Sequence, residues 1–265
     1  MIRQHHRINT AVALSATAAL LVAGCGGSSS SGRASGVNTV RAAYVSSSAE
    51  GYQMAIKVTG NGAGHTINVS GTGAFTQAAH SGRLTIHVSP ATLGGKNLQI
   101  DYVILGKDAY LKLPASLAGK IPGGRPWLQL DLSEIGKSAG IQGLSSLVES
   151  PGENPAHFLQ LLHADSTGTV QTLGHQTIDG VHTTALRATV DVSKVFGGLR
   201  YLPIEAWVDS SNHVRRIALS VTGHVEGEPF SENVQLDFIK YGPEPVPAAP
   251  PADQVTSIMS LYGAR

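Results

Sequence analysis

The chain is poor in cysteine, aromatic residues and charge. Its 265 residues include a single cysteine, Cys25, so no disulfide within the chain can stabilise the fold, and stability must come from a hydrophobic core. Aromatic residues make up 5% and charged residues 14% of the sequence, whereas glycine occurs 31 times. This composition is typical of a sheet-rich exported protein with many turns. The 19 basic and 18 acidic residues nearly balance, which argues against nucleic acid as a partner, because that usually requires a basic patch.

The one cysteine lies in a pattern, LVAGC at residues 21–25, that resembles a bacterial lipobox. Arg3 and Arg7 give a basic start, and residues 8–22 are mostly apolar, as in an export signal. This apolar run is too short for a membrane span of about 20 residues. We therefore predict that residues 1–24 are a lipoprotein signal peptide and that Cys25 is acylated. The acyl chains would hold the mature protein on the extracytoplasmic face of the cell membrane. The alternative is an ordinary secretory signal that contains a cysteine by chance.

The mature chain divides by composition into three parts. Residues 25–36 are rich in glycine and serine and predict a flexible lipidated tether. Residues 37–242 predict one folded domain, which starts with a short helix over 37–50 because Val37, Val40 and Ala43 recur at helical spacing. Residues 243–265 are a proline-rich tail, with a possible short helical turn over 255–261.

Alternation of apolar and polar residues predicts about eleven strands joined by tight turns. Those before the middle of the chain are expected at 52–59, 65–72, 74–79, 83–88, 98–105, 109–113 and 127–132, and those after it at 169–178, 181–190, 204–209, 214–223 and 230–241. Between them, a helix capped by Ser133 would run to about Val148, and a second would begin at Asn154. The fold class predicted is α+β, a curled antiparallel half-barrel with helices packed on its concave face.

Four stretches carry a family resemblance: residues 127–132 (WLQLDL), 178–184 with 189–192, 202–209 with 214–216, and 249–255. Together with the lipobox, they resemble the LppX/LprA/LprF/LprG-type lipoproteins of actinobacteria, which share the fold of the LolA lipoprotein carrier. None of the stretches is a catalytic motif. The resemblance implies a half-barrel with helices across its mouth, and an apolar cavity that holds acyl chains of lipids or glycolipids in characterised members.

Inward-facing apolar residues would line such a cavity. The residues expected to contact acyl chains are Ile56, Val58, Ile67, Val69, Leu84, Ile86, Ile100, Phe158, Leu161, Leu186, Leu219 and Leu236. Small residues on the same face, such as Gly71, Gly73, Ala188 and Ala206, could leave the interior underfilled. The alternative is that Phe158, Leu161, Leu162 and their sheet partners close a dry core.

Motifs for catalysis or for cofactor binding are not found. The eleven histidines include no H-x-x-x-H or H-E-x-x-H pattern, and the sequence has no G-x-S-x-G, phosphate loop or dinucleotide fingerprint. We therefore predict a protein that is not an enzyme, with no metal site and no cofactor. The first hypothesis is a lipid-anchored protein that binds or transfers lipid or glycolipid. The second is an envelope interaction or sensory lipoprotein that uses the same fold without a ligand and binds a protein partner through its helices or residues 243–251. A hydrolase is a distant third.

Overall fold

The protein is an open sheet of twelve strands, seen in a computed structural model that describes residues 29–62, 65–77, 80–89, 98–119, 123–131, 170–191, 201–225 and 228–258. The strands are β1 (Tyr52–Gly62), β2 (His65–Thr76), β3 (Ser81–Val88), β4 (Leu98–Leu105), β5 (Asp108–Lys112), β6 (Trp127–Asp131), β7 (Gln171–Ile178), β8 (Val181–Asp191), β9 (Tyr201–Asp209), β10 (Val214–Val225), β11 (Glu228–Tyr241) and β12 (Val255–Ser257). The helices are α1 (Ser29–Ser48), the short α2 (Ala115–Ala118) and the 3₁₀ turn η1 (Ala252–Gln254).

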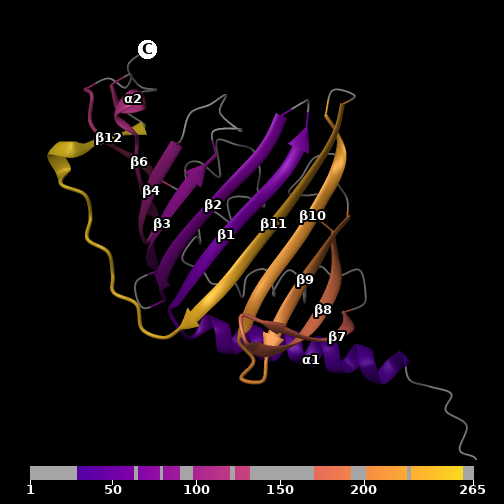
Figure 1. Cartoon of the computed structure of the whole chain (residues 1–265). Coiled ribbons are helices and arrows are strands. Elements are labelled where there is room, and N and C mark those ends of the chain that lie inside the picture. The colour runs from indigo at the N-terminus through magenta and orange to yellow at the C-terminus, as the bar shows by residue number, and fades with distance from the viewer. Residues whose placement is uncertain are drawn as a thin grey trace, which may run out of the picture.

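The strand order is β12-β6-β5-β4-β3-β2-β1-β11-β10-β9-β8-β7. Two antiparallel meanders, β1–β6 and β7–β11, therefore meet where β1 pairs with β11, from Tyr52 opposite Tyr241 to Gly62 opposite Phe230. Figure 1 shows the sheet curving away on both sides of this junction. β12 and β7 are the two edges, so the sheet is not closed into a barrel. The prediction of a large, curled, mostly antiparallel sheet is confirmed.

Two predictions about the strands are wrong. The segments 65–72 and 74–79 form one strand, β2, because Gly73 does not break it and pairs with Met54 on one side and Leu84 on the other. Residues 255–257, expected to start a helical turn, form β12 and pair in parallel with β6, from Val255 opposite Trp127 to Ser257 opposite Gln129. The helices predicted from Ser133 and from Asn154 lie outside the described residues.

Helix α1 begins at Ser29, within the segment expected to be a flexible tether, and ends at Ser48. Its inner face consists of Gly36, Val40, Ala43 and Ser47, which are all buried and recur every three or four residues. Gly36 allows a close approach, because a Cβ there would lie 3.1 Å from Cγ1 of Val170. The helix lies across one end of the sheet, below β7 to β10 (Figure 1). None of the described helices has the length and apolarity needed to cross a membrane.

Candidate functional site: the apolar face of the sheet

One face of the sheet, named here the apolar face, carries rows of aliphatic residues that cross the strands. The pairing register sets Leu186, Ala206, Ile217, Leu236, Ile56, Gly71, Ile86 and Ile100 side by side, from β8 to β4. Successive side chains of a strand point to opposite faces, so residues two positions away along each strand share this face. The next row is Ala188, Ile204, Leu219, Val234, Val58, Val69, Val88 and Leu98.

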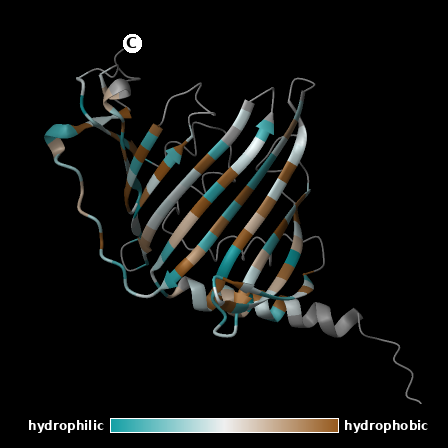
Figure 2. Ribbon diagram, viewed as in Figure 1, coloured by the Kyte–Doolittle hydropathy of each residue, from teal (hydrophilic) through white to brown (hydrophobic). Residues whose placement is uncertain are grey.

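The opposite face of the sheet is mostly polar, apart from a small buried cluster of Ile178, Ala185 and Trp207. Ion pairs bridge neighbouring strands there, between Arg187 and Glu205 and between Arg216 and Asp237. The resulting alternation of apolar and polar residues along the strands is visible in Figure 2. The aliphatic side chains of the sheet are therefore concentrated on the apolar face.

Most of the predicted cavity residues lie on this face. The two rows include Ile56, Val58, Val69, Ile86, Ile100, Leu186, Leu219 and Leu236, and Leu84 lies in a third row, beside Gly73 and Tyr102. Ile67 lies in β2, opposite Gly60. Cys25, Phe158 and Leu161 are outside the described residues. Contact between these residues and lipid stays a prediction.

Burial is uneven across the apolar face. On the side of β8 to β10, Leu186, Ile204 and Ile217 are at most 2% exposed and belong to the main core cluster. Toward the other meander, Ile86 and Ile100 are only half-buried. One side of the face is therefore closed, whereas its centre and far side keep accessible apolar area.

Two of the small residues on this face, Gly71 and Gly73, lie close to atoms of the neighbouring strands. A Cβ on Gly71 would lie 2.9 Å from Cγ2 of Ile56, and one on Gly73 would lie 3.1 Å from Cδ1 of Leu84. Neighbouring strands therefore leave no room for a Cβ at either glycine, and an underfilled interior above the sheet stays a prediction. Ala188 and Ala206 are fully buried.

Aromatic residues close the end of the apolar face next to α1. The ring of Tyr52 stacks on Phe75 at 5.3 Å and meets the edge of Phe238 at 5.5 Å. Burial, with a smaller effect from nearby Tyr241, raises the pKa of Tyr52 well above its usual value. The Tyr241 hydroxyl donates to the carbonyl of Val214 (2.7 Å), and burial likewise raises its pKa.

A polar cluster ties α1 to the β9–β10 turn at the same end. The backbone N–H of Val214 donates to Oγ of Ser47 in α1 (3.2 Å). Asp209, whose side chain is 3% exposed, accepts from the backbone N–H groups of Ser211 (2.8 Å) and His213 (2.9 Å) and pairs with Nε of Arg215 (2.7 Å). Sequence reasoning missed this cluster, although an Asp before a Ser-Ser-Asn turn is a signal for side-chain capping of a turn.

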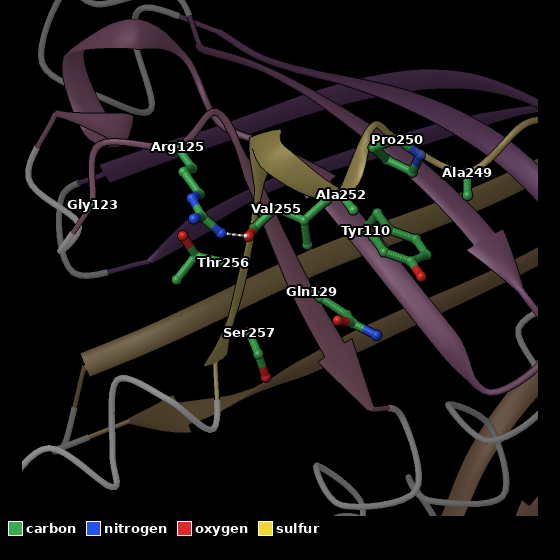
Figure 3. A pocket seen from close by; sticks show the side chains of 10 residues that line it. All are labelled: Tyr110, Gly123, Arg125, Gln129, Ala249, Pro250, Ala252, Val255, Thr256 and Ser257. Atoms are coloured by element: carbon green, nitrogen blue, oxygen red, sulfur yellow. Dashed lines mark hydrogen bonds between the residues drawn. The ribbon is translucent and has the colours of Figure 1, made fainter.

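A groove of about 700 Å³ lies on the polar side, between β5–β6 and the C-terminal segment. Figure 3 shows Arg125 reaching the start of β12, where Nη1 donates to the carbonyl of Val255 (2.6 Å), with Tyr110 and Gln129 lining the same groove. Among the residues that the structure describes, no three His, Cys, Asp or Glu side chains gather as a metal site would require.

The sequence matches no protein-family profile and no curated protein. Solved structures do match. LprF from Mycobacterium bovis is 13% identical and superposes with a TM-score of 0.50, over 81% of this chain and 97% of LprF. The fold is similar to that of LprF. The lipoprotein LppX of Mycobacterium tuberculosis is 16% identical, with a TM-score of 0.44, over 82% of this chain and 99% of LppX. At 13% identity the similarity to LprF concerns the fold alone, and for the fold it confirms the resemblance that the sequence motifs indicated.

Proposed function

We propose that this protein is a lipid-anchored extracytoplasmic protein that binds or transfers lipid or glycolipid by holding acyl chains against its apolar face. The observation that supports this most directly is the continuous apolar row from Leu186 to Ile100, whose far side is only half-buried. Covering such area with an acyl chain is favourable by about 25 cal/mol per Å² removed from water.

The dimensions of the face suit a hydrocarbon chain. Strands lie about 4.8 Å apart, so the row from β8 to β4 spans roughly 34 Å along the sheet. A bilayer core is about 30 Å thick, so the acyl chains of one leaflet extend about 15 Å. A chain can therefore lie across several strands and touch only aliphatic side chains. Such contacts have no directional chemistry, so they would select for length and apolarity.

The anchor in this proposal is acylation of Cys25, for which the lipobox is the support. One acyl chain binds a membrane only marginally, whereas two or more give stable anchoring. The binding reaction requires no catalytic residue, metal or cofactor, because burial of apolar surface provides the free energy.

Native mass spectrometry tests the proposal on a soluble form that starts after Cys25, made in an actinobacterial host, with lipid extraction of the same sample. We expect discrete adducts of lipid mass. Ile86→Trp fills part of the apolar face and should abolish them. His87→Trp is the matched control, because the adjacent His87 is exposed on the polar face, and should retain them.

An adduct-free mass from the folded wild-type protein would contradict lipid binding and favour the ligand-free interaction protein. Adducts lost equally in both Trp variants would also contradict it, because the effect would then not depend on the face that is filled. The far-ultraviolet circular dichroism of each variant shows that it is folded.

A further inference from the structure

The outer face of α1 differs from its buried face. Asn38, Arg41, Tyr44 and Val45 are exposed and recur at a spacing of three or four residues. Val45 is 61% exposed, although it is a β-branched apolar residue within a helix. The outer face thus combines an aromatic residue with a polar tip, an aliphatic residue and a long cationic side chain.

The charge of α1 is of one sign. Its sequence contains Arg33 and Arg41 and no Asp or Glu. The next acidic residue, Glu50, lies beyond the helix, 3.4 Å from Nε2 of His213. Basic residues beside Tyr and aliphatic side chains are typical of helices that lie in the interface of a membrane, where anionic headgroups attract the cations.

The position of α1 in the chain would bring it to such a surface. Only three residues separate Cys25 from Ser29, where the helix begins. At no more than about 3.6 Å per residue, the start of the helix lies within roughly 14 Å of the acylated residue. A helix of 20 residues is about 30 Å long, so its exposed residues come into reach of the bilayer when it lies parallel to the surface.

We propose that the outer face of α1 lies in the headgroup region of an anionic membrane and that this contact sets the orientation of the sheet. The inference rests on the proposed acylation of Cys25. It assigns α1 two functions, since its inner face closes one end of the apolar face and its outer face contacts lipid headgroups. The end of the sheet next to α1 would then face the membrane.

The acylated chain has no free thiol of its own that would compete for a label. Cys25 is the only cysteine, and acylation occupies its thiol, so a cysteine introduced elsewhere is the only free thiol. The variant Val45→Cys carries an environment-sensitive fluorophore. Thr222→Cys is the control, because Thr222 is exposed in β10, eight residues or about 26 Å beyond Val214, and so lies at the end of the strand away from α1. Both are bound to vesicles of phosphatidylcholine and phosphatidylglycerol that contain a nitroxide-labelled lipid.

We expect the label at position 45 to shift to the blue and to be quenched severalfold more than the label at 222. The label of a second variant, Asn38→Cys, on the same helix face, should behave like that at 45, and Arg41→Glu should reduce the quenching.

A protein that floats with the vesicles but keeps both labels in water would overturn the inference and leave the anchor intact. Equal quenching at 45 and 222 would overturn it as well. A protein that does not float would refute acyl anchoring and this inference together, whereas the lipid adducts of the soluble form test cargo binding independently.

Discussion

At the scale of single residues, Asp209 is the side chain on which the β9–β10 turn depends. It accepts two backbone N–H groups and pairs with Arg215 while almost fully buried. Asp209→Ala would leave these donors without their acceptor, and we expect the free energy of unfolding to fall by about 2–4 kcal/mol. Urea denaturation followed by circular dichroism measures this change.

The control for Asp209 is Glu205, whose ion pair with Arg187 lies on the exposed polar face. Exposed pairs contribute at most about 1 kcal/mol, so Glu205→Ala should change the free energy of unfolding by less than that. A loss for Asp209→Ala as small as that for Glu205→Ala would show that the turn does not need its buried carboxylate.

The buried tyrosines predict how stability depends on alkaline pH. The pKa of Tyr52 and Tyr241 is raised in the folded protein, whereas an unfolded tyrosine ionises near pH 10. Below about pH 10 both states are neutral, so their contribution is constant. Above it, ionisation favours the unfolded state, and the free energy of unfolding should fall by up to about 1.4 kcal/mol per pH unit for each tyrosine.

Tyr52→Phe should make this decline less steep. Chemical denaturation at a series of alkaline pH values, with tyrosinate absorbance recorded in parallel, measures it. Equal slopes for wild type and variant would mean that Tyr52 ionises freely in the folded protein.

At the scale of elements, α1 offers a matched pair of valines on its two faces. Val40 is fully buried against the core, whereas Val45 is 61% exposed. Val40→Ala removes buried methyl groups and leaves a cavity, so we expect a loss of about 1–3 kcal/mol in the free energy of unfolding. Val45→Ala should stay within about 0.5 kcal/mol of wild type. Thermal and urea unfolding of both variants decide whether α1 is packed as described, and equal effects would contradict that packing.

The strand β12 forms one edge of the sheet and pairs with β6. Three parallel pairs and the Arg125–Val255 hydrogen bond hold it there. Truncation after residue 251 should therefore expose the backbone of β6 and speed amide hydrogen exchange there by an order of magnitude or more, while β10, in the middle of the other meander, exchanges as before. Unchanged exchange in β6 would show that β12 does not protect this edge.

The elements that the sequence predicted well are those with their own local pattern. Strands such as Leu98–Leu105 alternate clearly, and the Asp179-Gly180 turn has the positive φ angles, 47° and 82°, that suit these residues in a tight hairpin. β12 was missed because three residues are too few to show an alternating pattern. Its pairing with β6 also depends on the path that residues 242–251 take between β11 and β12. The start of α1 was missed because a Ser/Gly-rich segment has no helical signal, and its packing on Val170 is a tertiary contact.

At the scale of the whole molecule, the apolar face belongs to neither meander alone. Its rows cross the β1–β11 junction, where Ile56 lies opposite Leu236 and Val58 opposite Val234. Alternation within each strand was enough to predict which residues share the face. Which residues of different strands lie side by side in a row was not predictable, because the register between strands far apart in sequence follows from long-range pairing. The same holds for the crowding over the glycines, which neighbouring strands cause.

This continuity predicts that the sheet unfolds as one unit. The main core cluster runs without a break from Ile104 and Ala109 in one meander to Val190 in the other. The only two tryptophans lie in opposite halves of the sheet, Trp127 in β6 and Trp207 in β9. The variants Trp207→Phe and Trp127→Phe each leave one native fluorescent probe. Each probe should report the same urea midpoint as the circular dichroism of its own variant. Separate midpoints for fluorescence and circular dichroism would mean that the two meanders fold independently and that the apolar face assembles only when both are present.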